Sequence, residues 1–319
     1  MNAISYKKGV VIPYNKRLMP TTTANQARLQ FFQPTRNPTY CTRKIETSWG
    51  RAEVTGRLGV MHAALLESIM FFALDKRVLE DGSVQILVDP YDLRRTLGEG
   101  ARKSRQLVPS KHHPERMRRR ISAGGYSSAA IRKLITDLIA CAISITIKRR
   151  DGQDDSWVIG GVVALAEASE ATRTNPGTGE SRRMWRVTLT PLAARLFGED
   201  VALHYDPRPL AALRSGVAAA VGRWCLSHKE SLGAGWKLDT VLKAVGAETS
   251  GPAGRQRRLD IRREADGLRA CGLVVQNDRI YTEGVVPMPT SVVPTPTKTN
   301  SVVCTPTSVV PTPTKRGSL

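Results

Sequence analysis

Arginine side chains recur on one face of a segment near the C-terminal end of the sequence. From Ile261, apolar residues at i, i+4 and i+7 define the core face of a predicted helix over residues 255–270, and arginines occupy another face. A guanidinium group binds phosphate and the edge of guanine through paired hydrogen bonds, so this pattern indicates contact with nucleic acid. The candidate DNA-contacting residues of this helix are Arg255, Arg257, Arg258, Arg262 and Arg263.

The elements around this helix predict a small domain over residues 206–284. Apolar spacing predicts helices over 210–224 and 236–245, and Gly272 ends the arginine helix. A short hairpin follows, with Arg279 as a candidate phosphate contact. Helix, helix and hairpin in this order are typical of a winged helix, which inserts its last helix in a major groove and lays its hairpin on the adjacent backbone.

A similar order of elements occurs earlier in the sequence, over residues 56–205. Apolar spacing predicts a helix from Val60, a strand over 84–88 and a short helix that ends at Gly98. Residues 99–125 are a long basic insertion, which is more typical of a functional loop than of a packed element. We therefore expect an α+β fold with two tandem winged-helix domains.

The last helix of this first domain follows the insertion. Ser127 or Ser128 caps it, and apolar residues recur at i, i+3, i+4, i+7 and i+8 from Ile131. Strands over 143–150 and 157–165 then form a predicted wing. The candidate DNA contacts lie away from the apolar stripe or on the wing, and they are Ser128, Arg132, Lys133, Thr136, Lys148, Arg149 and Arg150.

The sequence carries a large positive charge. A net charge of +20 and a pI near 10.3 over 319 residues indicate a polyanionic partner, because each Lys or Arg placed on a phosphate releases a condensed counterion. No apolar run approaches the roughly 18 residues that a membrane span requires, and the N-terminus has no apolar signal core. We expect a soluble, cytoplasmic protein that binds double-stranded DNA and has no membrane partner.

Both ends of the sequence lack a helical period. Residues 1–55 are interpreted as a basic flexible arm, with one short ordered piece around Leu29 to Phe32. Residues 285–319 repeat a seven-residue unit rich in Pro, Thr and Val, which predicts a disordered tail that adds little to DNA affinity. The repeat also indicates a repeat in the DNA that encodes the tail. Its period of seven codons is 21 base pairs, about two turns of B-DNA.

Catalytic chemistry is missing from the sequence. Residues 98–104 lack the second glycine and the spacing of a phosphate-binding loop, and His112 and His113 are adjacent, so on a loop they point apart. The five cysteines are widely spaced and never form a C-x-x-C pair, which argues against a disulfide framework or structural zinc. We expect no enzyme activity, no cofactor and no metal.

The chain resembles plasmid replication initiators of the RepA and TrfA type, most closely those of W-group broad-host-range plasmids. The resemblance rests on the tandem domain order over about residues 55–284, the helix over 210–224 with Ser227-His228 after it, and the basic helix over 255–270. It implies binding to directly repeated origin sites called iterons, opening of nearby DNA, and recruitment of the host initiator DnaA and the replicative helicase. It also implies association with the bacterial nucleoid or plasmid, and dimers that act in copy control.

Two alternatives belong to other classes. A winged-helix transcription regulator without a replication role usually joins one DNA-reading domain to a ligand or partner domain, so two basic copies in one chain favour the initiator. An origin-nicking enzyme would need metal-binding histidines separated by one apolar residue on a strand, with a tyrosine nucleophile nearby, and that pattern is not found.

Overall fold

A computed structural model describes most of the chain between Met19 and Glu283. The described residues are 19–28, 30–47, 50–98, 126–148, 154–174, 179–198, 202–228 and 234–283. The first residues of the predicted arm, the basic insertion, the wing residues Arg149 and Arg150 and the repeat tail lie outside the described residues. Within the described ranges, no helix is long and apolar enough to cross a membrane.

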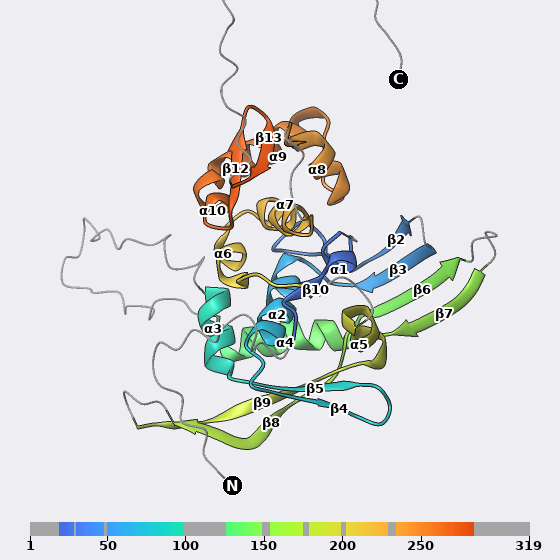
Figure 1. Cartoon of the computed structure of the whole chain (residues 1–319), viewed down its shortest axis with the longest axis vertical. Coiled ribbons are helices and arrows are strands. Elements are labelled where there is room, and N and C mark those ends of the chain that lie inside the picture. The colour runs from blue at the N-terminus through green and yellow to red at the C-terminus, as the bar shows by residue number, and fades with distance from the viewer. Residues whose placement is uncertain are drawn as a thin grey trace, which may run out of the picture. The chain divides into compact units, whose positions relative to one another are not determined.

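Helix α2 is the centre of a first hydrophobic core. All its residues from Val60 to Met70 are buried, so it is covered on every side rather than amphipathic. Its buried His62 accepts a hydrogen bond from the Gly59 N–H at Nδ1 and lies 3.2 Å from Asp137 of α4 at Nε2. Helices α3 and α4 pack against it (Figure 1). The bounds are α2 Val60–Phe71, α3 Pro90–Gly98 and α4 Ser128–Ala140.

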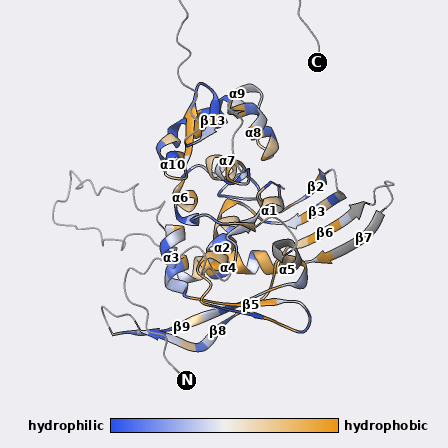
Figure 2. Cartoon of the chain, viewed as in Figure 1, coloured by the Kyte–Doolittle hydropathy of each residue, from blue (hydrophilic) through white to orange (hydrophobic). Residues whose placement is uncertain are grey.

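Two four-stranded antiparallel sheets complete the first region, which we define as residues 41–198. One sheet has the order β2-β3-β6-β7 and the other β4-β5-β9-β8. Strand β5 alternates buried and half-buried residues, as the sequence predicts, and Figure 2 shows it as mostly hydrophobic. The bounds are β2 Cys41–Thr47, β3 Gly50–Gly56, β4 Asp75–Val78, β5 Val84–Val88, β6 Ala142–Lys148, β7 Asp154–Gly160, β8 Val163–Thr174, β9 Ser181–Leu189 and α5 Pro191–Gly198.

The first sheet corrects two expectations. Residues 41–47 and 50–55, predicted to lie in a flexible arm, form strands, and β3 pairs with β6. The outward face of this hairpin is charged, with Lys44 opposite Glu53, so its strand pattern is weak in a sequence rich in polar residues. The predicted return strand over 157–165 is two strands in two sheets, because the chain leaves β7 at Gly160 and the Val162 N–H bonds the Leu138 carbonyl of α4.

A second core lies in residues 202–283, the second region. Its element order is the short strand β10, helices α6 and α7, strand β11, helices α8, α9 and α10, and then the hairpin of β12 and β13. Strands β11, β12 and β13 form a sheet of order β11-β13-β12. The bounds are β10 Ala202–Leu203, α6 Pro207–Ala212, α7 Gly216–Leu226, β11 Trp236–Lys237, α8 Leu238–Ala244, α9 Gly251–Arg263, α10 Ala265–Arg269, β12 Leu273–Gln276 and β13 Arg279–Thr282.

Three predicted helix boundaries in the second region are wrong. The predicted helix over 210–224 is divided into α6 and α7, because Ser215 caps α7 by accepting the Ala218 N–H. Residues 236–237 form a strand instead of starting α8. The predicted helix over 255–270 begins at Gly251 and breaks at Glu264, whose side chain accepts hydrogen bonds from two backbone N–H groups at the start of α7.

The N-terminal segment, residues 19–40, holds the second region through helix ends. Arg28 donates to the Ser227 carbonyl at the end of α7, Gln30 to the Ala244 carbonyl at the end of α8, and Arg36 to the Leu213 carbonyl after α6. The last carbonyls of a helix have no partner within it, and donors or cations placed there satisfy them. The arginines that predicted a free basic arm are therefore structural here. This segment also contains β1 Thr22–Thr23 and α1 Ala24–Arg28.

A buried ion pair joins the two regions directly. Glu67 of α2 accepts hydrogen bonds at 2.5 and 3.1 Å from Arg223 of α7, and the Tyr205 hydroxyl donates to the same carboxylate at 2.8 Å. Glu67 is fully buried and the Arg223 side chain is 7% exposed. Burial and the nearby carboxylate raise the pKa of Tyr205 well above its usual range, so the phenol stays a hydrogen-bond donor.

Candidate nucleic-acid interface

The outward face of α9 carries the exposed cations of the second region's last long helix. Gly254 and Ile261 are buried, and a Cβ at Gly254 would lie 2.3 Å from the Thr249 backbone, so this face packs tightly on the turn before the helix. On the opposite side Arg255, Arg262 and Arg263 are exposed. The geometry thus separates a packed face from a cationic face, as the sequence predicts.

Two of the candidate arginines turn toward the protein instead. Arg258 donates to Asp239 of α8 at 2.7 Å and to the Thr249 carbonyl at 2.9 Å, which ties α9 to α8 and to the connecting turn. Arg257 is half-buried and lies 3.9 Å from Asp260. The expectation that Arg258 lies on the exposed face is corrected, because its side chain is held by Asp239 and the Thr249 carbonyl. The sequence does not reveal this contact, since Asp239 is distant from Arg258 along the chain.

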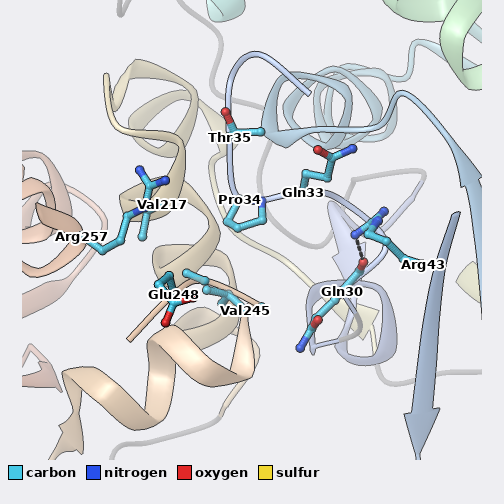
Figure 3. A pocket seen from close by; sticks show the side chains of 11 residues that line it. Gln30, Gln33, Pro34, Thr35, Arg43, Val217, Val245, Glu248 and Arg257 are labelled. Carbon is cyan, nitrogen blue, oxygen red and sulfur yellow. Dashed lines mark hydrogen bonds between the residues drawn. The ribbon is translucent and has the colours of Figure 1, made fainter. Parts of the chain in front are cut away.

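Arg257 lies at a shallow pocket between α9 and the N-terminal segment (Figure 3). The pocket measures about 280 Å³, and Arg43 beside it donates to the backbone carbonyls of Gln30 and Phe31. Burial lowers the pKa of Arg43 below its usual value. Arg43 already donates its hydrogen bonds to backbone carbonyls, so it has less capacity to bind an anion. We therefore interpret the pocket as a junction between chain segments rather than as an anion-binding site.

The hairpin turn between β12 and β13 places one more acid beside the cationic face of α9. Arg262 of α9 pairs with Asp278 at 2.5 Å, and both side chains are at least half exposed. Arg279, a predicted wing contact, donates from Nη1 to the Ala234 carbonyl at 2.6 Å and to the Gly235 carbonyl at 3.2 Å. The acids Asp239 and Asp278 were missed because nothing in their local sequence marks them as partners of α9.

Helix α4 of the first region also has a distinct outer face. Ile131, Ile135 and Leu138 are buried, and Ser127 caps the helix by accepting the Ala130 N–H at 3.1 Å. Of the predicted apolar stripe, Ile139 is instead 42% exposed. The candidate contacts on this helix divide into half-buried Ser128 and exposed Arg132, Lys133 and Thr136.

Thr136 uses its hydroxyl inside the helix. Its Oγ1 donates to the Arg132 carbonyl at 3.0 Å, so an outside contact can use only the methyl group or the oxygen as an acceptor. The predicted wing residue Lys148 ends β6, but its side chain lies outside the described residues, as do Arg149 and Arg150. The first region therefore offers Arg132 and Lys133 as described exposed cations on α4.

An aromatic group lies at the end of α7. The His228 ring is 4.1 Å from the Trp224 ring and 5.5 Å from the Trp236 ring, and His228 Nδ1 lies 2.9 Å from the Trp224 carbonyl. Burial lowers the pKa of His228. These contacts place the histidine in the packing between α7 and β11, in line with its interpretation from sequence as a helix-end residue.

Comparisons with known proteins give distant structural similarities. No protein-family model matches the chain, and no curated protein matches it. A solved structure of domains 2 and 3 of RctB, in its selenomethionine form, has a TM-score of 0.46 and 13% identity over 77% of this chain and 85% of that chain. A second structure, of RctB residues 155–483, has a TM-score of 0.42 and 12% identity over 81% of this chain and 94% of that one.

Proposed function

We propose that the protein is a plasmid replication initiator that binds directly repeated origin DNA through two winged-helix domains. The observation that carries the proposal is the outward face of α9. Arg255, Arg262 and Arg263 stand exposed on a helix that follows another helix and a tight turn, with α10 and then the β12–β13 hairpin after it. A helix of this kind fits a major groove, where arginine reads guanine and binds phosphate.

The second DNA-reading element in the proposal is α4. It follows α2 and α3 and precedes the β6–β7 hairpin, which is the helix and hairpin order of the second region. Its hairpin is extended by β2 and β3, whose outward charges alternate in sign, with Lys44 opposite Glu53 and Glu46 opposite Arg51. Since these charges compensate one another, the contacts to DNA are assigned to α4 and the end of β6 rather than to this sheet face.

The remaining parts of the proposal rest on the family resemblance of the sequence. They are binding to iterons of the RepA and TrfA kind, recruitment of DnaA and the replicative helicase, and homodimers in copy control. The protein acts as a binding protein without a catalytic site, cofactor or metal. The overall charge of +20 supports DNA as the partner, because each Lys or Arg that neutralises a DNA phosphate releases a condensed counterion, which favours binding.

A plasmid-establishment assay tests the replication role. The gene and the DNA that flanks it are placed on a circle without another origin, and colonies that maintain the circle are counted. We expect colonies with the wild-type gene and none when Arg255 and Arg262 are both replaced by alanine. The control variant Arg186→Ala removes an exposed, ion-paired arginine from β9 and should retain establishment. DNA binding to the flanking DNA without establishment would instead support a transcription regulator.

A further inference from the structure

The hairpin turn beside α9 contains an aspartate in a backbone conformation that favours glycine. Asn277 and Asp278 have φ values of 47° and 57°, the left-handed region that tight two-residue hairpin turns require at both central positions. Asn followed by Gly is the usual pair there, since a residue with a Cβ is strained in this region. A glycine at position 278 would form the same turn with less strain.

The carboxylate of Asp278 is fixed next to one DNA-facing arginine. The Leu238 N–H, at the start of α8, bonds the Asp278 carbonyl at 2.9 Å and so anchors the turn. The side chain accepts one hydrogen bond, from Arg262 Nη2. Asp278 also lines a hollow of about 230 Å³ with Asp239 and three cations, Lys237, Arg258 and Arg279.

The Arg262–Asp278 pair contributes little to the stability of the fold. The side chains are 50% and 59% exposed, and ion pairs with this exposure are weak in water because both charges remain solvated. The stability gained from this ion pair is therefore a weak reason for a strained aspartate in place of glycine. A reason exists on the DNA side of the pair.

One hydrogen bond to Asp278 leaves Arg262 with its other donors. A guanidinium has five N–H groups, so Arg262 can keep its carboxylate partner and still donate two parallel bonds to the edge of a guanine. Arg262 cannot bind a phosphate as well while it keeps Asp278, because the negative carboxylate repels the phosphate and competes with it for the guanidinium group.

We infer that Asp278 is a specificity-determining residue of the DNA interface, which holds Arg262 for base reading and opposes its use on phosphates of arbitrary sequence. The inference rests on the proposed function of α9. It predicts that removing the carboxylate raises affinity for all DNA and lowers the preference for the correct site.

The test compares wild-type protein with Asp278→Asn, Asp278→Gly and a charge-matched control, Asp266→Asn on α10. Asn and Gly both suit the left-handed backbone, so the two turn variants should melt at or above the wild-type temperature. Affinity is measured by fluorescence anisotropy for a duplex of arbitrary sequence and for a duplex that wild-type protein enriches from a random pool. Each titration is repeated across a salt series.

We expect both Asp278 variants to bind the arbitrary duplex roughly fivefold more tightly than the Asp266 control, with a salt slope steeper by about one, since one more phosphate contact is gained. The ratio of site to arbitrary affinity should fall by a similar factor. Equal behaviour of the Asp278 variants and Asp266→Asn would overturn the inference. Failure of every protein, wild type included, to bind duplex DNA would overturn the proposed function and the inference with it.

Discussion

The arginines of α9 lie in different environments although they are close in sequence. Arg258 joins α9 to α8 through Asp239 and the Thr249 carbonyl, Arg262 faces outward with Asp278 beside it, and Arg255 is exposed on the same face. Residue type and helical period predict that arginines lie opposite Ile261. They cannot predict which arginine meets an acid from another element, because that depends on how the helix packs.

This division gives different expectations for Arg258 and Arg262. Arg262→Ala should weaken binding to the enriched DNA site by about 1–3 kcal/mol, the usual cost of losing an arginine that reads guanine. Its melting temperature should not change, because the pair with Asp278 is exposed. The measurement is an anisotropy titration plus a thermal melt, with Arg186→Ala as a control for the loss of an exposed, paired arginine.

Arg258→Ala should instead lower stability. It removes the hydrogen bond from α9 to Asp239 of α8 and the hydrogen bond from α9 to the Thr249 carbonyl in the connecting turn. We expect a lower melting temperature than that of Arg262→Ala, because Arg258 alone of the two arginines bonds both α8 and the turn before α9. A melt identical to wild type, with DNA affinity reduced, would show that Arg258 faces the groove after all.

At the scale of elements, Glu264 separates α9 from α10. Apolar spacing continues without interruption from Ile261 to Leu268, so the sequence predicts one helix. The structure breaks it because the Glu264 side chain accepts the Arg214 N–H at 2.9 Å and the Ser215 N–H at 3.1 Å, two groups ahead of α7. A tertiary contact of this kind has no local signature.

Glu264→Ala should therefore destabilise the second region by about 1–2 kcal/mol, comparable to the loss of a helix cap. Glu264→Gln keeps a carbonyl oxygen at the same position and should retain most of the stability. Chemical denaturation of the full chain, followed by tryptophan fluorescence, distinguishes the two. Equal destabilisation by both variants would mean that the negative charge matters rather than the acceptor.

For the N-terminal segment, the prediction from composition was wrong. The lysines, arginines and prolines of residues 1–55 predict a free arm, yet Arg28, Gln30 and Arg36 complete the carbonyl ends of three helices in the second region. By contrast, the capped helix after Ser127, the stop at Gly246 and the hairpin after Gly272 follow from local chemistry and were predictable. Caps and turns are encoded locally, whereas a partner for a backbone carbonyl is chosen by the whole fold.

At the scale of the whole described chain, the two regions are joined by a buried ion pair as well as by the N-terminal segment. Replacing Glu67 with alanine leaves Arg223 buried without its partner, which should cost about 3–5 kcal/mol in the free energy of unfolding. The control Glu167→Ala breaks the exposed pair with Arg186 and should cost about 0–1 kcal/mol. Similar values from denaturant unfolding would indicate that water reaches Arg223 in solution.

The joined regions bear on how the two helices proposed to read DNA act together. Sequence analysis predicts a reading helix in each region, but it contains no information on the contacts between regions, because Glu67 and Arg223 are 156 residues apart. Those contacts tie α2, which packs against α4, to α7, which packs against α9. The two helices are therefore expected to engage one duplex as a unit.

Hydroxyl-radical footprinting on the enriched DNA site tests this central claim most directly. Wild-type protein should protect two groups of sugars on one face of the duplex, about one helical turn apart, one for each major-groove segment. Arg262→Ala should weaken protection of one group, and the double variant Arg132→Ala with Lys133→Ala should weaken protection of the other. A single protected group that is unchanged by the α4 variant, or protection that does not respond to Arg262→Ala, would contradict the account.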